Sequence, residues 1–396
     1  MKPLVLKAYT ATSCIGRGVA ATWDSLLERR SGLKPCDFET AELDTHIGRV
    51  GGVDAQRLPA NLQKFQCRNN RLAELALQQD GFLDAVEQAA ERWGRRRIGV
   101  FLGTSTAGIL QTELAYRELD PVSGALPPSF EYAATHNSFS VADYVRQRCR
   151  LEGPAVAVSC ACASSAKVFA SARRMIEADV IDAAVVGGVD SLCLTTLYGF
   201  HSLQLSSPAP CRPFDVARNG ISIGEAGAFA LLERMPKDGG GAVVLLGIGE
   251  SSDAYHMSAP HPEGLGARRA MQSALAAAAL EPGAIDYINL HGTGTPSNDR
   301  AESQAVTSVF GPTTPCSSTK GATGHTLGAA GALEAVIGAL VLTHGLMPGG
   351  VHTTTVDPTL TAHYIKDNHR APVSRVLSNS FGFGGTNCSL IFGRAE

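Results

Sequence analysis

The chain has 396 residues, 44% of them hydrophobic, and a formal net charge of −3 at pH 7. Such a chain can bury a large core and fits one to three globular domains. Because it has no basic excess and no run dense in lysine and arginine, we expect neither nucleic acid nor an anionic membrane surface as its main partner. The ten cysteines include no CxxC pair, which predicts reduced thiols and no zinc ribbon in a cytoplasmic protein.

Two apolar segments bear on export and membrane insertion. The apolar run within residues 1–10 is too short for the core of a secretory signal peptide. The most apolar stretch, residues 327–342, carries Glu334 and several glycines, and it is shorter than the roughly 20 apolar residues of a membrane span. We therefore expect a buried core helix there and no membrane anchor.

Apolar, β-rich runs alternate with helical patterns along the chain, which is typical of α/β layers. The expected strands cover residues 98–102, 155–158, 183–186, 228–232, 243–248 and 285–290.

A division of the chain is predicted at residues 235–241, where a proline and three consecutive glycines separate two apolar runs. The expected domains are residues 1–240 and 241–396. Each contains a strand, a small-residue loop and an Ala-rich helix, at 155–179 and 315–345, which is compatible with a duplicated fold.

The first candidate for chemistry is the segment Ser159–Ser165, between an apolar strand and a predicted helix. Apolar residues within 168–176 follow one helix face, so the helix should start beside Cys162. A cysteine at a helix N-terminus feels the positive end of the helix dipole, which favours the thiolate. From these residues alone, the segment is either a nucleophile or small buried packing, and either Cys160 or Cys162 could be that nucleophile.

The second candidate is His291–Thr295, which follows the expected strand 285–290 and precedes a helix containing Asp299 and Glu302. Open α/β sheets bind ligands at strand ends, and histidine can donate a hydrogen bond or exchange a proton near neutral pH. No GxxxxGK[ST] pattern occurs, so a phosphate-binding loop of that kind is a poor alternative. A purely structural role for His291 stays open at this point.

Two further glycine-containing segments lie closer to the C-terminus. Lys320–Thr326 brings a lysine and a histidine together between an apparent strand and a long helix. Its lysine either tunes a neighbouring group or is a solvated charge. Ser380–Asn387 places Phe383 among glycines, which suits a gate or an amide donor to an oxyanion, and equally a tight hairpin.

Taken in order, these segments resemble those of the β-ketoacyl-acyl-carrier-protein synthases, in the elongating branch with a Cys-His-His triad. A fifth match is Arg212–Asp215 with Arg218, Gly220 and Gly224–Glu225, close to the RPFD...RDG...GEG signature of that family. The resemblance covers nearly the whole chain. It implies an α/β thiolase fold made of two duplicated βαβ-rich halves in a five-layer αβαβα arrangement.

The resemblance also implies catalytic roles. Cys162, which is followed by Ala-Ser-Ser, is the implied nucleophile, and His291 and His325 are the implied triad histidines. Lys320 matches the lysine that supports the second histidine. Phe383 matches the gating aromatic residue, and its backbone N–H and that of Cys162 are the implied oxyanion donors.

Other matched positions concern substrate binding. Thr293 and Thr295 fall where the family hydrogen-bonds the pantetheine arm. Thr106 and Ala107 fall where it lines the acyl pocket, often at the dimer interface. Phe200 either closes this pocket or packs in the core, and Phe381 is a further implied substrate-binding residue.

Four positions outside the triad complete the comparison with the family. For Asp299 and Glu302 the resemblance implies a buried charge network near Lys320, with a solvated helix face as the alternative. Cys160 and Asn219 depart from the family, which usually has Ser or Thr at the first position and often Asp at the second.

The implied activity is that of a β-ketoacyl synthase, an acyltransferase that condenses acyl- and malonyl-carrier protein with loss of carbon dioxide. The product is a 3-oxoacyl-carrier protein in fatty acid, polyketide or polyene biosynthesis. We expect no metal and no other cofactor, because the phosphopantetheine of acyl carrier protein holds the substrates. The implied partners are acyl carrier protein and a second subunit, either an identical chain or a ketosynthase-like protein.

Three other classes of protein compete with this interpretation. A non-catalytic chain-length factor typically lacks the nucleophile, so the presence of Cys162 with both histidines counts against it. A thiolase or an initiating synthase would need a second catalytic cysteine or an asparagine where this chain has His291 and His325. A pure carrier-binding module would bind its partner without turnover, and an assay distinguishes it.

Overall fold

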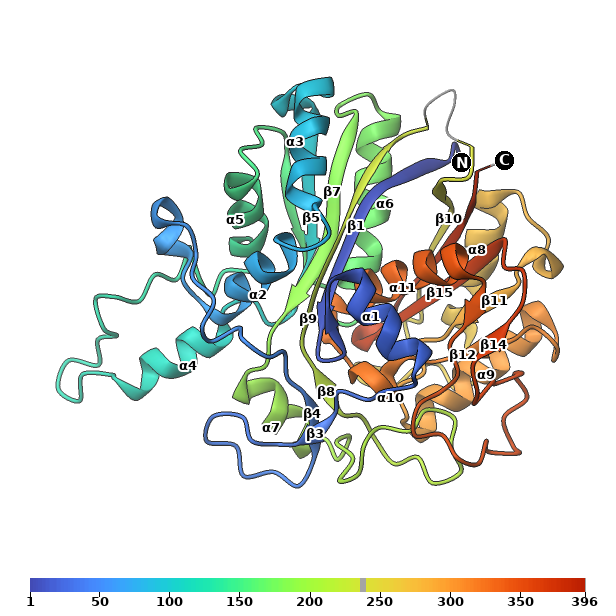
Figure 1. The fold of residues 1–396 in the computed structure, drawn as a ribbon. Helices are drawn as coiled ribbons and strands as arrows, with labels where there is room; N and C mark the ends of the chain where they lie inside the picture. The colour runs from blue at the N-terminus through green and yellow to red at the C-terminus, as the bar shows by residue number, and fades with distance from the viewer. Residues whose placement is uncertain (236–239, 396) are drawn as a thin grey trace.

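The computed structural model describes residues 1–235 and 240–395, so part of the predicted division at 235–241 lies outside the described residues. An 11-stranded sheet runs through the molecule in the order β12-β11-β15-β16-β10-β1-β9-β7-β5-β6, with β2 paired to β1 beside this path (Figure 1). The N-terminal half contributes β1 (Leu4–Ser13), β5 (Ile98–Gly103), β6 (Ala155–Val158), β7 (Ala183–Asp190) and β9 (Ala226–Arg234). The C-terminal half contributes β10 (Val243–Ser252), β11 (Tyr287–Asn289), β12 (Cys316–Ser317), β15 (Arg375–Gly382) and β16 (Thr386–Arg394).

The two halves of this sheet have the same strand order and directions. Counted outward from the middle, β1, β9 and β7 are antiparallel neighbours, and β7, β5 and β6 are parallel. In the other half β10, β16 and β15 are antiparallel, and β15, β11 and β12 are parallel. A short antiparallel pairing of β1 with β10 joins the halves. The predicted duplicated α/β fold is therefore confirmed.

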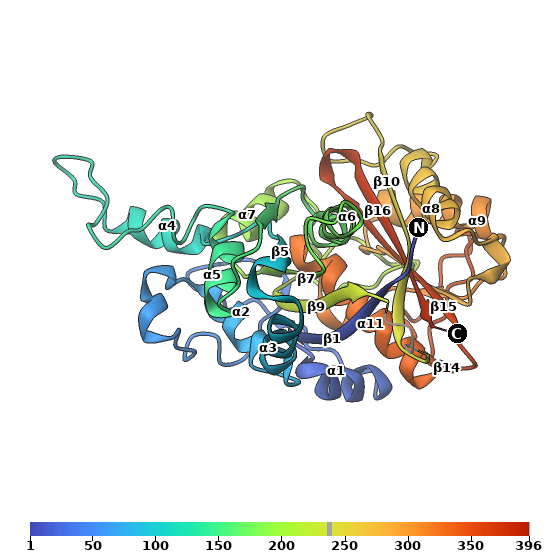
Figure 2. The same ribbon diagram turned by 90° about the horizontal axis from the view of Figure 1, so that it is seen from above.

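Helices form three layers around the two half-sheets (Figure 2). In the middle layer α6 (Ser164–Glu177) contacts β5 and β7, while α11 (Ala330–His344) contacts β9 and β15. The N-terminal half-sheet is covered on its outer face by α2 (Arg68–Leu77), α3 (Phe82–Trp93) and α5 (Ser140–Arg148). The C-terminal half-sheet is covered by α8 (Leu265–Ala278), against which α9 (Pro296–Phe310) packs. The arrangement is the five-layer αβαβα order of the thiolase fold.

The middle layer explains the most apolar part of the sequence. The window Leu327–His344 is long and apolar enough for a membrane span, but 89% of it is buried inside the protein. A helix that is apolar all round belongs in a core between two sheets, so the predicted core helix is confirmed. At Gly331 an added Cβ would lie 2.7 Å from the backbone nitrogen and the Cβ of Ala166, so only glycine lets α11 approach α6 this closely.

The remaining elements are short and lie mostly around the ends of the sheet. The helices are α1 (Gly18–Leu27), α4 (Ile109–Arg117), α7 (Leu194–Ser202) and α10 (Lys320–Thr323). The strands are β2 (Gly16–Arg17), β3 (Lys34–Pro35), β4 (His46–Gly48), β8 (Ile223–Gly224), β13 (Leu346–Met347) and β14 (His369–Arg370). The 3-10 turns are η1 (Ala60–Phe65), η2 (Arg95–Arg97), η3 (Pro282–Ala284), η4 (Leu327–Ala329) and η5 (Phe383–Gly385).

Candidate active site

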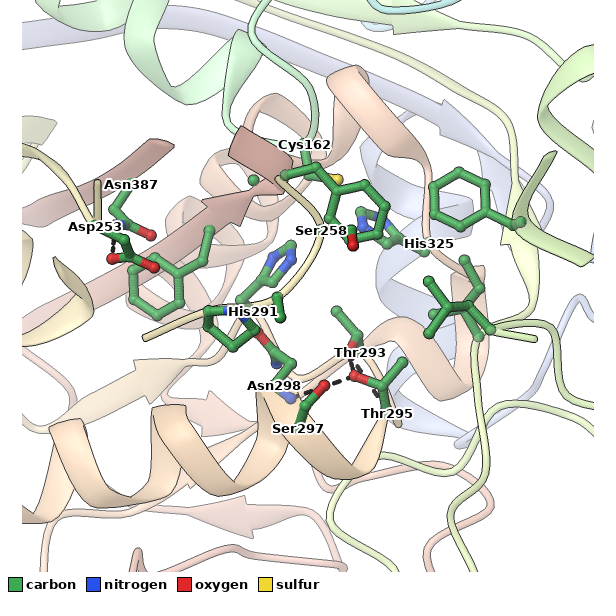
Figure 3. A pocket seen from close by; sticks show the side chains of 18 residues that line it. Cys162, Asp253, Ser258, His291, Thr293, Thr295, Ser297, Asn298, His325 and Asn387 are labelled. Atoms are coloured by element: carbon green, nitrogen blue, oxygen red, sulfur yellow. Dashed lines mark hydrogen bonds between the residues drawn. The ribbon is translucent and has the colours of Figure 1, made fainter. Parts of the chain in front are cut away.

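Three buried side chains from both halves of the molecule meet at one end of the central helices. Cys162 lies in the loop between β6 and α6, His291 follows β11, and His325 lies in the loop between β12 and α11. The Cys162 sulfur and one ring nitrogen of each histidine are within 4.8 Å of one another. Figure 3 shows the three side chains around a common cavity. The fold thus brings Cys162 to two histidines that are each more than 100 positions away from it in the sequence.

The local turn fixes the direction of Cys162. The Ser164 hydroxyl accepts a hydrogen bond from the Cys160 N–H (2.9 Å) and donates one to the Ala161 carbonyl (2.5 Å), and α6 begins at Ser164 as predicted. Ala161 has a left-handed backbone, with φ of 53°, which turns the chain sharply before the nucleophile.

The environment of Cys162 opposes ionisation. Burial raises the pKa of the Cys162 thiol to about 12, although the positive charge of Lys320 and the Phe383 N–H both act to lower it. Burial of the sulfur therefore acts against the thiolate that the helix N-terminus is expected to favour. The resting group is a thiol that must lose its proton as it attacks.

Hydrogen-bond partners indicate the tautomer of both histidines. Lys320 Nζ lies 3.5 Å from His291 Nδ1, and the Leu327 N–H donates to His325 Nδ1 at 3.3 Å. Since each Nδ1 accepts, the proton of each neutral ring is on Nε2. Burial, reinforced by the charge of Lys320, holds the pKa of both histidines well below 6.5, so both rings are neutral near pH 7. Two Nε2–H donors are available next to Cys162.

A buried ion pair lies next to His291. Lys320 is 1% exposed and pairs with Glu334 of α11. Burial raises the pKa of Glu334 to about 7, while the charge of Lys320 acts in the opposite direction. Lys320 contacts His291, whereas the resemblance had assigned it to His325. Glu334 was noticed in the sequence only as a charge in an apolar helix, and that isolated carboxylate was the available signal.

Two carboxylates of α9 hold the loop that carries His291. Glu302 accepts hydrogen bonds from the N–H groups of His291 (2.8 Å) and Gly292 (2.7 Å). Asp299 accepts from the Gly294 N–H at 3.2 Å and lies 3.6 Å from the Arg218 guanidinium. Both are at most 1% exposed, so they do not form a solvated face. Their hydrogen bonds hold this loop, and the charge of Lys320 also acts on Glu302, although the ionic partner of Lys320 is Glu334.

The cavity beside the triad has aromatic and hydroxyl-bearing walls. Thr293, Thr295, Phe200, Phe381 and Phe383 line it together with the three triad side chains. The two threonine hydroxyls are 2.9 Å apart, and the rings of Phe200 and Phe383 lie 5.6 Å from each other. These five predicted site residues therefore come together with Cys162.

Two predicted pocket residues are not in the wall of this cavity. The side chain of Thr106 is fully buried and donates to Asp190 at 2.9 Å, and Ala107 is 6% exposed. Nothing in the sequence indicates that the Thr106 hydroxyl points toward Asp190.

One part of the cavity wall was not predicted at all. Asp253, Ser258, Ala259 and Pro260 lie after β10, and Ser297 and Asn298 lie on α9. Asp253 accepts a hydrogen bond from Asn387 Nδ2 at 2.8 Å, and its N–H donates to the Gly385 carbonyl at 2.8 Å. This loop is therefore tied to the segment that contains Phe383. No residue pattern marked it in the sequence.

Cysteine and two histidines are also donors that zinc accepts. In such sites the second ring nitrogen usually donates to a carboxylate or carbonyl, which leaves the first as a free lone pair. Here the second nitrogens accept from Lys320 and Leu327, so the nitrogens facing Cys162 carry protons. This polarity suits hydrogen-bond donors better than metal ligands.

Comparisons with known proteins agree with this geometry. The family model of the β-ketoacyl synthase N-terminal domain matches residues 1–238, and that of the C-terminal domain matches residues 242–354. The chain is 29% identical to the 3-oxoacyl-[acyl-carrier-protein] synthase 2 of Staphylococcus aureus (strain COL), over 100% of this chain and 99% of that protein. It is 31% identical to the mitochondrial 3-oxoacyl-[acyl-carrier-protein] synthase of Arabidopsis thaliana, over 96% of this chain and 90% of that protein.

Two solved structures extend the comparison. One is a chain from a ketosynthase in complex with its chain length factor, from Xenorhabdus doucetiae. It has a TM-score of 0.90 and 38% identity, over 100% of this chain and 98% of the other. The second is a β-ketoacyl synthase from Burkholderia phymatum STM815, with a TM-score of 0.89 and 30% identity over 100% of both chains.

Proposed function

The chain belongs to the β-ketoacyl synthase family, and from this premise we propose that Cys162 carries the acyl group while His291 and His325 activate the malonyl group. The protein is a 3-oxoacyl-[acyl-carrier-protein] synthase, an acyltransferase. It condenses acyl- and malonyl-carrier protein to 3-oxoacyl-carrier protein and carbon dioxide. The residues described above account for both steps.

In the first step Cys162 attacks the thioester of acyl-carrier protein. The Cys162–acyl bond forms, the bond to the phosphopantetheine sulfur breaks, and the thiol proton ends on the departing sulfur. The Phe383 N–H acts to lower the pKa of the Cys162 thiol, and together with the Cys162 N–H it can stabilise the tetrahedral oxyanion.

In the second step the malonyl thioester oxygen accepts hydrogen bonds from the two Nε2–H groups. Loss of carbon dioxide leaves an enolate, and these donors stabilise its negative charge. The enolate carbon attacks the acyl-Cys162 carbonyl, and collapse releases the 3-oxoacyl product with the Cys162 thiolate, which regains a proton. Lys320 keeps His291 Nδ1 an acceptor, and its pairing with Glu334 holds the ammonium in place.

The single observation that carries this proposal is the buried contact of Cys162 with two neutral imidazoles whose protons face it. A chain-length factor has no use for this arrangement, so it remains the weaker alternative. The hydrogen-bond polarity of the histidines also supports a reaction that needs no metal.

Acyl carrier protein and a ketosynthase-like subunit are the proposed partners. Structural neighbours are described as ketosynthases in complex with a chain length factor or an acyl-carrier protein. The terminal strand β6 has four apolar, half-buried residues and no partner on its outer edge among the described residues, which suits pairing with a second subunit. We also propose that the enzyme is cytoplasmic. Among the described residues, the one stretch long and apolar enough for a membrane span is a buried core helix.

The test is intact-mass analysis of the enzyme after incubation with acyl-carrier proteins of several chain lengths, with its partner subunit present. The wild type and Cys160→Ala should gain the acyl mass and lose it as 3-oxoacyl product when malonyl-carrier protein is added. Cys162→Ala should gain nothing. An equally acylated Cys162→Ala variant, or a wild type that accepts no acyl group, would refute the assignment.

A further inference from the structure

Asp190, the last residue of β7, is a buried carboxylate that the reaction scheme above does not use. It is fully buried, and none of the ion pairs among the described residues includes it. Instead it accepts hydrogen bonds from the loop after β5. The donors are the Thr104 hydroxyl (2.7 Å), the Ser105 N–H (2.8 Å) and hydroxyl (2.7 Å), and the Thr106 N–H and hydroxyl (2.9 Å each).

A further donor comes from the other half of the molecule. The Gly328 N–H donates to Asp190 at 2.5 Å, and Gly328 lies in the turn η4 between His325 and α11. An added Cβ at Gly328 would lie 2.6 Å from the Ser105 hydroxyl and 2.7 Å from the Asp190 carboxylate. Only glycine therefore lets the turn press against this carboxylate.

This turn also sets the tautomer of His325. Leu327, the neighbour of Gly328, donates its N–H to His325 Nδ1 and has a left-handed φ of 51°. A branched-chain residue in that conformation is strained and needs support from its surroundings. The hydrogen bond from Gly328 to Asp190 supplies that support one residue away.

We propose that Asp190 is a positioning residue for the malonyl-dependent step. Its hydrogen bond with the Gly328 N–H holds the turn at Leu327 and Gly328 in place. As a result, His325 Nδ1 stays an acceptor and the His325 Nε2–H stays directed at the cavity. The inference rests on the proposed role of His325. It also explains the polar segment Thr104–Thr106 as a frame that fixes the carboxylate.

The chemistry of the site requires a carboxylate. An ionised carboxylate only accepts, and its two oxygens can take several donors at once, whereas an asparagine amide would turn an NH₂ group toward some of the same donors. The Asp190 charge also raises the pKa of the Cys162 thiol, although less than burial does. Removal of the Asp190 charge should therefore speed the acylation of Cys162, whereas the lost hydrogen bonds should leave the His325 ring less well positioned.

The experiment compares Asp190→Asn with Asp215→Asn in single-turnover assays of the enzyme with its partner subunit. Asp215 is a matched control, because it is 1% exposed and accepts the N–H groups of Ala217, Thr354 and Thr355, away from the His325 turn. In Asp190→Asn the rate constant for condensation of pre-acylated enzyme should fall roughly 100-fold, the loss expected for a misplaced catalytic group. The acylation rate at pH 7 should stay constant or rise. In a plot of acylation rate against pH, the rate should begin to increase at a lower pH than in the wild type.

Equal losses in acylation and condensation, with an unmoved pH profile, would show a merely structural role and overturn the proposal. If Asp190→Asn does not fold, Gly328→Ala tests the same contact from the other side and should show the same selective loss. Failure of the premise has a different signature, because His325→Ala would then leave condensation intact. A wild type without an acyl adduct would instead refute the proposed function itself.

Discussion

The loops that follow β5 and β11 occupy equivalent places, because each strand is the fourth from the junction of the two halves. In the N-terminal half, Asp190 accepts the N–H groups of Ser105 and Thr106. In the C-terminal half, Glu302 accepts those of His291 and Gly292. In each loop a buried carboxylate accepts hydrogen bonds from two consecutive N–H groups. Only the loop after β11 carries a catalytic side chain.

The loops that follow β6 and β12 differ in a similar way. Cys162 lies two residues before α6, and no buried ion pair lies under it among the described contacts. After β12 the chain passes through Lys320 and His325 before α11 begins, and Lys320 pairs with Glu334 of that helix. The duplicated fold therefore provides a loop held by a buried carboxylate in each half. The chemistry is divided, because the nucleophile comes from the N-terminal half and the two histidine donors come from the C-terminal half.

The largest expected effect concerns the buried ion pair between Lys320 and Glu334. Lys320→Met leaves Glu334 buried without its partner, and breaking a buried pair in this way costs about 3–5 kcal/mol of unfolding free energy. Urea unfolding at pH 8 should show this loss. The double variant Lys320→Met/Glu334→Leu should recover most of the stability but not the condensation rate. If the double variant is as unstable as the single one, the pair is not the source of the loss.

The division of chemistry predicts the next largest effect. His325→Ala should lower the condensation rate about 10²- to 10³-fold, because one donor to the enolate oxygen is lost, and should spare acylation of Cys162. Single-turnover intact-mass measurements separate the two steps. Cys162→Ser, which changes the N-terminal half instead, should impair both. If His325→Ala lost acylation as strongly as condensation, the division of chemistry between the two halves would be wrong.

The buried carboxylate Glu302 gives a pH dependence. Burial raises its pKa from 4.5 to about 7, so the folded state binds the proton more tightly than the unfolded state. Stability is then highest below pH 4.5 with respect to this group, and it falls as the pH rises toward 7, by up to about 3 kcal/mol. Glu302→Gln should flatten this part of the curve in denaturant titrations at pH 5 and pH 8. An unchanged difference between the two pH values would contradict the assignment.

The sequence predicted the parts of the molecule that depend on local patterns. Strands that are apolar throughout, such as β5 and β7, were located to within a few residues, and the start of α6 beside Cys162 was correct. The strands β1, β15 and β16 were not named, because they contain buried polar residues. Thr10 and Thr12 of β1, for example, are fully buried, so the apolar pattern of a strand is interrupted.

Long-range partners of the site residues were beyond the sequence. The motifs gave the order Cys162, His291 and His325, and the fold brings these residues together. No pattern links Lys320 to Glu334, or Thr104 to Asp190, because each pair is formed by tertiary packing between separate elements. The direction of the Thr106 side chain, toward a carboxylate rather than the cavity, is a property of that packing too.

The smallest predicted effect concerns the contact between the rings of Phe200 and Phe383 in the cavity wall. Phe200 of α7, from the N-terminal half, packs against Phe383 of the C-terminal half with an interplanar angle of 37°. Such a pair contributes about 0.5–1.5 kcal/mol. Phe200→Ala should therefore shift the ratio of acylation rates toward longer acyl-carrier proteins by about 2- to 10-fold, since the ring no longer narrows the cavity.

The matched control for this shift is Tyr198→Ala, on the same helix but 42% exposed and outside the cavity wall. Competition between two acyl-carrier proteins of different chain length, followed by intact mass, measures the ratio directly. A loss of both acyl groups in equal proportion would mean that Phe200 supports Phe383 and does not limit chain length. The aromatic pair would then join the two halves mechanically, and the size limit of the pocket would lie elsewhere along its wall.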